Sequence, residues 1–245
     1  KLIFKIFRII NMSKLKNILC ISHHAEVELG IIKSFLLSNN CNINIAKPLN
    51  NTSCLKSNIN DLSGVIILGG SMNVADEKKL IGLRKELKWI ENLIDNSIPT
   101  IGICLGAQLI AKAAGSEVGP HKDKIVEIGY KNIINNSSKS IFKDFPKKVF
   151  QWHSQGFTLP NSAKLIASNS TFKIQAFSIK NKIFGFQFHP EVDKKMILNW
   201  NKKSAHMLSF RGAIPENTQL EDHTKYSNIV RSWFEKFMKN WIALI

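Results

Sequence analysis

Short apolar segments that alternate with a helix-like segment are the feature that most constrains the fold of this chain. Residues 64–68 (GVIIL) and 100–104 (TIGIC) have the apolar character of parallel strands that are covered on both faces. Residues 76–95, which lie between them, carry an apolar stripe at helical spacing opposite a charged face. This alternation predicts an α/β fold, with an open, mostly parallel sheet flanked by helices.

The other expected elements extend this pattern and add strands in the C-terminal half. In the first half we expect strands at 17–21 and 42–46, helices at 26–37 and 105–114, and a loop over 47–63. In the second half we expect strands at 124–134, 149–157, 173–179 and 182–188, and helices at 194–207 and 224–241. We expect one domain over residues 12–245, with residues 1–11 as an extension upstream of a translation start at Met12.

The formal charge of +16 comes from 34 Lys and Arg against 18 Asp and Glu. Such a charge can indicate nucleic acid, an anionic membrane or an acidic partner. However, 30 of the basic residues are Lys and only 4 are Arg, whereas Arg is expected where phosphates or bases are bound bidentately. The apolar runs also stay below the roughly 20 residues that span a bilayer. We therefore expect neither nucleic acid nor a membrane as a partner.

The four cysteines are Cys20, Cys41, Cys54 and Cys104, and no CxxC pair or zinc-type His/Cys spacing accompanies them. We therefore expect no disulfide framework, no metal and no cofactor, and a reducing cytoplasm is the expected compartment. The first three cysteines are expected to be core or loop thiols without a role, whereas Cys104 has a distinctive setting.

Cys104 lies in the segment Ile-Gly-Ile-Cys-Leu-Gly-Ala-Gln at 101–108, where an expected strand meets an expected helix. Gly102 and Gly106 flank it in a G-x-C-x-G pattern, which is typical of the nucleophile elbow of hydrolases. A sharp turn there would expose the thiol above the carboxyl edge of the sheet. The positive end of the following helix would favour the thiolate and offer backbone N–H groups to a developing oxyanion.

A candidate base for this thiol lies far downstream, in the segment Phe-Gln-Phe-His-Pro-Glu at 186–191. A strand that ends in this sequence can present the imidazole of His189 at the same edge of the sheet. The carboxylate of Glu191, two residues later, can hydrogen-bond the far ring nitrogen and select the tautomer. Cys104, His189 and Glu191 are therefore the predicted nucleophile, base and orienting residue.

Three segments together resemble the class I (triad) glutamine amidotransferases: LGGSMN at 68–73, GICLGAQ at 102–108 and GFQFHPE at 185–191. The resemblance covers roughly residues 16–195 and is greatest to the stand-alone GMP-synthase-like members, to which VFQWHS at 149–154 adds. It implies a flavodoxin-like glutamine amidotransferase fold. It also implies that Cys104 attacks the side-chain amide of glutamine to form a γ-glutamyl thioester, while His189 transfers protons and Glu191 orients it.

Further roles are implied by the resemblance alone. The backbone N–H groups of Gly70 and Leu105 would form the oxyanion hole, and Gln108 and His153 would contact the substrate. Relatives often have His-Gly-Asp where this chain has His-Ser-Gln at 153–155. This departure bears on substrate recognition and not on the thioester chemistry.

Two other groups of residues have simpler interpretations. His23 and His24 follow the first expected strand, and we expect them to be solvated loop residues. Four aromatic residues fall at helical spacing near the end of the chain, namely Trp233, Phe234, Phe237 and Trp241. We expect these four to pack in the core, with a stripe that faces a partner as the alternative.

The fate of the ammonia is constrained by motifs that the sequence lacks. It contains neither a G-x-x-x-x-G-K-[ST] phosphate loop nor a Ser-Gly-Gly-x-Asp-Ser pyrophosphatase loop. About 50 residues follow residue 195, which we expect to be too few for a nucleotide-activating domain. We therefore expect a glutaminase that passes ammonia to a separate ATP-dependent synthase subunit, such as one that makes GMP.

Two alternatives remain open. The first is a γ-glutamyl peptide or amide hydrolase, which uses the same thioester chemistry without an ammonia acceptor. The second is a catalytically silent domain that binds a ligand or partner, which the intact set of Cys104, His189 and Glu191 disfavours.

Overall fold

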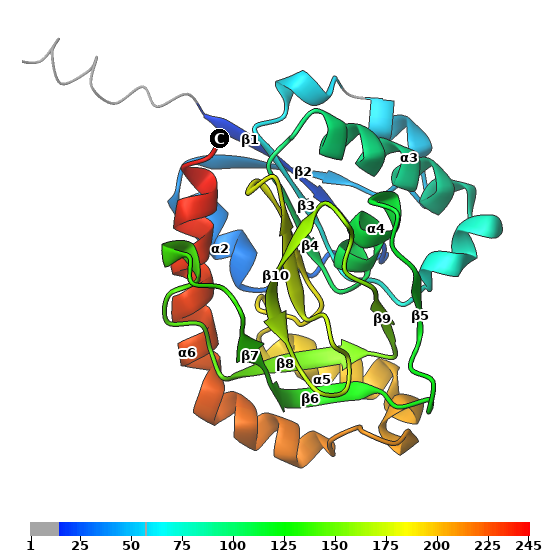
Figure 1. Ribbon diagram of the computed structural model, residues 1–245, viewed down its shortest axis with the longest axis vertical. Coiled ribbons are helices and arrows are strands. Elements are labelled where there is room, and N and C mark those ends of the chain that lie inside the picture. Colours follow the sequence, from blue (N-terminus) through cyan, green and yellow to red (C-terminus); the bar gives the residue numbers. More distant parts are fainter. Residues whose placement is uncertain (1–14, 57) are drawn as a thin grey trace, which may run out of the picture.

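An eight-stranded sheet runs through the middle of the molecule in the computed structural model, which describes residues 15–56 and 58–245 (Figure 1). The strands follow the order β2-β1-β3-β4-β12-β11-β10-β7. In that order they are Cys41–Ala46, Lys16–Ile21, Gly64–Ile67, Thr100–Ile103, Ile183–Phe186, Ala176–Ile179, Ala163–Ser168 and Ile134–Asn135. The expected extension at residues 1–11 lies outside the described residues, and the single domain over 12–245 stays a prediction.

Five neighbouring strands, from β2 to β12, are parallel, and the remaining three are antiparallel additions. The carboxyl ends of β1, β3, β4 and β12 therefore meet at one edge of the sheet. The predicted α/β architecture, with additional strands in the C-terminal half, is confirmed. This edge is where open parallel sheets place their ligands.

Helices cover both faces of the sheet. They are α2 (Ile31–Ser38), α3 (Ile81–Asp95), α4 (Leu105–Ala113), α5 (Lys194–Lys203) and α6 (Glu216–Ile242). Side chains of one strand alternate between the two faces, so that Ile18 of β1 packs in the core beneath α2 and α6, whereas Leu19 packs in the core beneath α3 and α4. Figure 1 shows α6 and α3 on opposite sides of the sheet. Burial on both faces explains why the central strands read as continuous apolar runs.

Two small antiparallel sheets accompany the main sheet. They pair β5 (Val118–Pro120) with β9 (Gln155–Phe157), and β6 (Glu127–Asn132) with β8 (Lys148–His153). The expected strand at 124–134 is thus divided, because β6 pairs with β8 while β7 pairs with β10. The expected strand at 149–157 is divided at Ser154 for the same reason, since β8 and β9 have different partners.

Several expected boundaries were wrong for local reasons. Helix α2 begins at residue 31 and not at 26, because Gly30 has φ 50°, a left-handed conformation that an α-helix does not contain. Helix α3 begins at residue 81 and not at 76, since the extended Leu80 separates it from a short 3₁₀ turn, Val74–Lys78. Short 3₁₀ turns also form within the expected loop at 47–63.

Two differences lie in the second half of the chain. Strand β10 was not expected, because its residues, AKLIAS, have no clear alternation and the pairing with β11 contains an irregularity between Leu165 and Ala167. Helix α6 starts at Glu216, eight residues before the expected start, and Pro215 occupies its N-cap position with extended backbone. The first turns of this helix carry few apolar residues, so the sequence pattern did not reveal them.

The four C-terminal aromatic residues of α6 pack in the core, as expected, rather than forming an exposed stripe. Each is at most 2% exposed. The ring centre of Phe237 lies 5.1 Å from those of Phe184 and Phe186, both on β12, and the ring also packs against Phe142. Helix α6 is therefore a structural part of the sheet's cover.

Replacement of Phe237 by Ala should lower the free energy of unfolding by about 3–5 kcal/mol, because it removes a fully buried aromatic ring and leaves a cavity. Chemical denaturation followed by circular dichroism would measure this loss. Ile229→Ala, on an exposed part of the same helix, is the matched control and should change stability by less than about 0.5 kcal/mol. Equal effects of the two variants would contradict the packing of α6.

Candidate active site

Cys104 occupies a strained turn between β4 and α4. Its backbone has φ 52° and ψ −108°, a region that residues with a side chain rarely adopt, and its N–H donates to the carbonyl of Phe186 at 2.8 Å. A Cβ at Gly106 would lie 2.1 Å from the carbonyl oxygen of Ile67, and one at Gly102 would lie 2.6 Å from the backbone of Gly106. The G-x-C-x-G spacing thus lets α4 approach the sheet closely enough to force the turn.

His189 and Glu191 lie at the same edge of the sheet as Cys104. The His189 Nδ1–H donates to Glu191 Oε1 at 2.8 Å, and both side chains are buried. A Cβ at Gly69 would lie 3.1 Å from His189 Cε1 and 3.6 Å from the Cβ of Cys104, which places both side chains beside one glycine. The structure therefore brings the three predicted catalytic residues together.

The charge of His189 is controlled by these neighbours. Burial by itself lowers the pKa of His189, but the charge of Glu191 and then Cys104 outweigh it and raise the pKa to about 10. The imidazole therefore favours its charged form at neutral pH. A cation beside the sulfur stabilises the thiolate, which is the reactive form of cysteine.

The segment after His189 is held by α2. The N–H of Ile31 donates to the carbonyl of Glu191 at 3.0 Å. Gly30 allows this approach, since a Cβ there would lie 1.9 Å from the same carbonyl oxygen. The turn before α2 therefore positions the backbone of Glu191, the predicted orienting residue.

Gly70, predicted to be in the oxyanion hole, follows β3 and lies beside the start of α4. A Cβ on Gly70 would lie 2.6 Å from Leu105 Cδ2 and 2.9 Å from the Cβ of His23. The two residues of the predicted oxyanion hole, Gly70 and Leu105, are thus neighbours. Their role as donors to an oxyanion stays a prediction.

A cavity of about 600 Å³ opens above these residues, and Cys104, His189, Glu191 and Gly70 all line it. This volume is within the usual range of small-molecule sites. The lining combines the Cys104 thiol with the backbone of the glycine turn and with aromatic and charged side chains from outside the three motifs.

Sequence reasoning missed three of these lining residues: Glu28, Trp152 and Trp200. Glu28 accepts hydrogen bonds from Trp200 Nε1 at 2.9 Å and from Asn199 Nδ2 at 3.0 Å. The Trp200 ring meets the His189 ring edge to face, with ring centres 4.7 Å apart. No sequence signal marks Glu28, because its position in the cavity depends on contacts with the distant helix α5.

Strand alternation places Trp152 and His153 on opposite faces but does not say which of them faces the site. Trp152 lies in β8 directly before His153, and successive side chains of a strand point to opposite faces. Trp152 lines the cavity, whereas His153 is absent from its lining. His153 Nδ1 lies 2.9 Å from the carbonyl of Gln155, and its Nε2 lies 3.2 Å from Glu127 Oε2.

Gln108, the other predicted substrate contact, is buried next to the cavity and not in its lining. Its Nε2 donates to the carbonyl of Gln155 at 3.2 Å and to Gln187 Oε1 at 3.3 Å. Gln187 Nε2 in turn lies 3.8 Å from Cys104 Sγ. Direct contact of Gln108 or His153 with the substrate stays a prediction.

The expectation that His23 is a solvated loop residue was wrong. Its side chain has no exposure, and its Nε2 lies 3.0 Å from Glu86 Oε2, on α3, which is also fully buried. The chain after β1 turns into the protein at this point, and this could not be read from local sequence. His24 is exposed, as expected, and lines the cavity.

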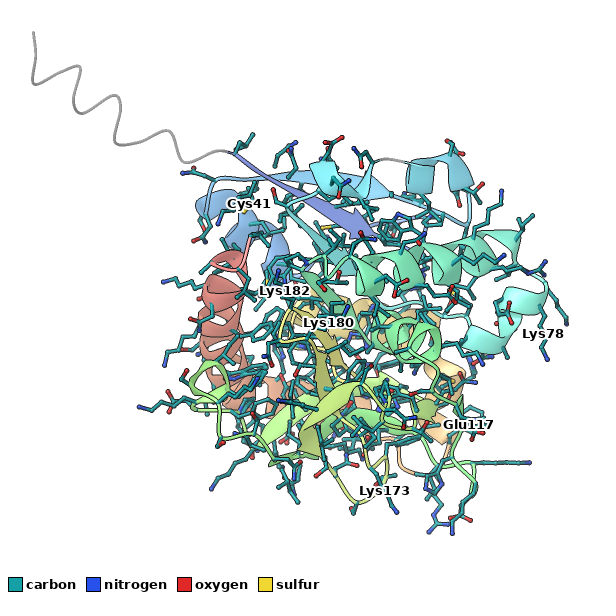
Figure 2. All side chains as sticks on the ribbon, turned by 45° about the horizontal axis from the view of Figure 1, so that its top comes forward. Cys41, Lys78, Glu117, Lys173, Lys180 and Lys182 are labelled. Atoms are coloured by element: carbon teal, nitrogen blue, oxygen red, sulfur yellow. The ribbon has the colours of Figure 1, made fainter. Side chains whose placement is uncertain are left out.

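Three other features bear on partners and ligands: the surface lysines, possible metal ligands and the apolar character of the helices. In Figure 2, Lys78 and Lys173 project from separate parts of the molecule. Within residues 15–56 and 58–245, no three His, Cys, Asp or Glu side chains gather so that they could hold a metal ion. Across the same described part of the chain, no helix combines the length and apolar character needed to cross a membrane.

Comparison with known sequences agrees with this geometry. The family described as glutamine amidotransferase class-I matches residues 26–197. The chain is 33% identical over 141 residues to a glutamine-hydrolyzing GMP synthase subunit of Thermoplasma acidophilum, covering 56% of this chain and 67% of that protein. The corresponding subunit of Picrophilus torridus is 36% identical over 138 residues, covering 54% and 69%. These matches span about two thirds of the relatives' length.

Solved structures show the same fold over nearly the whole chain. A glutamine amidotransferase from Thermotoga maritima has a TM-score of 0.84 at 27% identity, covering 94% of this chain and 99% of that one. A glutamine amidotransferase from Methylobacillus flagellatus has a TM-score of 0.82 at 26% identity, covering 94% and 95%. The chain belongs to the class I glutamine amidotransferase family, a family of enzymes, and within it is similar to glutamine-hydrolyzing subunits of GMP synthases.

Proposed function

We propose that this protein hydrolyses the side-chain amide of glutamine through a cysteine thioester and passes the ammonia to a separate ATP-dependent synthase subunit. The observation that carries this proposal is the strained Cys104 beside the buried His189–Glu191 pair, in one cavity. Such a set of nucleophile, base and orienting carboxylate is the arrangement that covalent amide hydrolysis needs.

Acylation would begin with attack of the Cys104 sulfur on the side-chain carbonyl carbon of glutamine. The thiol proton would reside on Nε2 of His189, because Nδ1 donates to Glu191. The developing oxyanion would accept hydrogen bonds from the N–H groups of Gly70 and Leu105. Collapse of the tetrahedral intermediate breaks the carbon–nitrogen bond, and the proton from His189 leaves with ammonia.

Deacylation would reuse the same residues. His189, now neutral, would accept a proton from water, and the resulting hydroxide would attack the thioester. The carbon–sulfur bond then breaks, which releases glutamate and restores the thiolate of Cys104. The balance is one glutamine and one water consumed for one glutamate and one ammonia.

The ammonia acceptor is proposed from relatives. The matched relatives are named as subunits of glutamine-hydrolyzing GMP synthases, and a glutamine-hydrolyzing GMP synthase of Cytophaga hutchinsonii matches over 25% of its length at 33% identity. A synthase of a purine nucleotide is therefore the proposed partner. A reducing cytoplasm is the proposed location, since Cys104 must stay a free thiol.

The substrate end of the cavity would recognise the amino-acid part of glutamine. Glu28 lies in the same cavity as Cys104, and its carboxylate is held in place by Asn199 and Trp200. An immobilised carboxylate next to an aromatic ring is suited to an ammonium group. We therefore assign Glu28 to the α-ammonium of the substrate.

Hydrolysis of larger γ-glutamyl amides is a second candidate, favoured by the cavity volume of about 600 Å³ and by its two Trp rings. Ammonia release from glutamine, measured with and without a GMP-synthase-type ATP-dependent subunit, separates the two. Stimulation by that subunit supports the glutaminase. Turnover of γ-glutamyl dipeptides without turnover of glutamine would favour the second candidate.

Replacement of Cys104 by Ala should reduce glutamine hydrolysis by at least about 10³-fold, because it removes the nucleophile. Cys54→Ala is the matched control, since Cys54 lies outside the cavity and should leave the rate unchanged. Glutamate release by coupled assay measures both. Full activity of Cys104→Ala would refute the thioester mechanism.

Replacement of Glu191 by Gln should make the reactivity of Cys104 depend on pH. In the native protein the pKa of His189 is raised to about 10, so His189 stays charged as pH rises through neutrality. Removal of the Glu191 charge lowers the pKa of His189, and the charge is then lost at a lower pH. Alkylation by iodoacetamide should therefore be flat between about pH 6.5 and 8.5 in the wild type, but slow and rising with pH in the variant.

The exposed Glu221→Gln, on α6, removes the same charge outside the cavity lining and should leave the flat profile unchanged. A flat profile in Glu191→Gln would mean that His189 does not depend on Glu191 for its charge.

Replacement of Glu28 by Gln should raise the KM for glutamine about 10- to 100-fold and leave kcat nearly unchanged, since one charge-assisted hydrogen bond to the ground state is lost. The test compares glutamine with glutaramate, the analogue that lacks the α-ammonium. Turnover of glutaramate should be equal in wild type and variant. A loss of the same size for both compounds would contradict the assignment of Glu28.

A further inference from the structure

His23 and Glu86 form a buried ion pair that the proposed chemistry does not use. Neither side chain has any exposure, and neither lines the cavity. Burial of two charges costs desolvation energy, which mutual attraction at best repays, so stability alone is a weak reason for such a pair. The surroundings of His23 point instead to the glycine turn after β3.

Both ring nitrogens of His23 have a partner. The Nε2 lies 3.1 and 3.0 Å from the two carboxylate oxygens of Glu86, and the Nδ1 lies 3.3 Å from the carbonyl oxygen of Gly69. A neutral imidazole carries one N–H and could serve only one of these acceptors. Only the charged form donates to both, so the contacts are mutually consistent when His23 is protonated.

Glu86 holds His23 in that form. Burial lowers the pKa of His23, but the charge and hydrogen bond of Glu86, with smaller contributions from the backbone of Gly69 and Leu68, leave it above its ordinary value. The Nδ1–H is therefore available to the Gly69 carbonyl at neutral pH.

The Gly69 carbonyl belongs to the same peptide unit as the N–H of Gly70. No peptide bond in the described chain is cis, so this C=O and N–H point in opposite directions. His23 lies outside the cavity and contacts this carbonyl, while Gly69 and Gly70 both line the cavity. Because the carbonyl faces His23, the N–H of Gly70 points away from His23.

The turn needs such a restraint because its own sequence supplies none. The backbone pairing of β3 ends where Leu68 N–H donates to the carbonyl of Ile21 at 3.0 Å. Gly69 and Gly70 then follow in succession, and glycine on both sides makes rotation of a peptide unit inexpensive. The Nδ1–H of His23, which Glu86 holds in place, restricts that rotation.

We propose that His23, oriented by Glu86, is a positioning residue that fixes the peptide unit between Gly69 and Gly70 and so aims the Gly70 N–H into the oxyanion hole. This role presupposes the proposed amide hydrolysis. His23 does not touch the reacting atoms, so its removal should change the rate of the chemical step and spare substrate binding and the thiol itself.

Two variants that share a Leu at position 86 form the test. His23→Leu with Glu86→Leu removes the pair without leaving a buried charge, whereas His23→Asn with Glu86→Leu restores a side-chain N–H close to where Nδ1 lies. The leucine variant should lose about 10²-fold in kcat for glutamine with little change in KM, as expected when an oxyanion donor is misplaced. The asparagine variant should recover at least about tenfold of that loss.

Alkylation of Cys104 by iodoacetamide separates a positioning role from a merely structural one. General distortion of the site would slow alkylation as well as catalysis. Displacement of iodide forms no oxyanion, so both variants should react at the wild-type rate although their kcat values differ. Equal kcat in the two variants would overturn the proposal. A parallel loss of kcat and alkylation rate would also overturn it, since it would mean general distortion of the site.

If the leucine variant does not fold, His23→Asn and His23→Gln replace the pair. The amide nitrogen of Asn can lie where Nδ1 lies and that of Gln where Nε2 lies, so Asn should retain kcat and Gln should lose it. Equal values would overturn the proposal. Wild type and Cys104→Ala belong in the same assay. Absence of wild-type turnover would refute the proposed function. Wild-type turnover together with equal kcat values in the position-23 variants would refute only the role of His23.

Discussion

The close approach of α4 to β3 is the constraint on which the site depends. Gly106 permits it, since any side chain there would meet the carbonyl of Ile67. The short distance leaves the chain no room for a gradual turn, so Cys104 takes a positive φ at the end of β4. Packing of α4 against the sheet offsets the backbone strain at Cys104. The turn places the thiol at the carboxyl edge of the sheet, beside the N-terminus of α4.

Parallel pairing then determines which other groups meet this thiol. Strand β12 lies next to β4, although some 80 residues separate them in the sequence, and their register places Phe186 opposite Ile103. His189 therefore follows its strand at the same edge as Cys104. The charge of Glu191 then keeps His189 cationic inside a buried site, where an isolated imidazole would be neutral.

Much of this arrangement could be predicted from local sequence. The apolar runs at 64–68 and 100–104 indicated buried parallel strands, and glycines around Cys104 indicated a tight turn, because such patterns report backbone conformation directly. Other residues that line the cavity could not be predicted in this way. Trp152 rather than His153 faces the cavity, a choice set by the phase of strand alternation, and Glu28 reaches the cavity only through contacts with α5.

The sequence by itself predicted the candidate reaction centre, because the predicted nucleophile, base and orienting carboxylate each lie in a short motif whose backbone geometry is local. Only the tertiary structure decided what surrounds that centre. His23 shows the reason. The sequence gives no sign that it differs from its neighbour His24, and both were expected to be solvated. In the structure His23 is buried against Glu86, 63 residues away, and contacts the Gly69 carbonyl. A buried charge is tolerated only where a distant partner meets it, and such a meeting is a property of the fold as a whole.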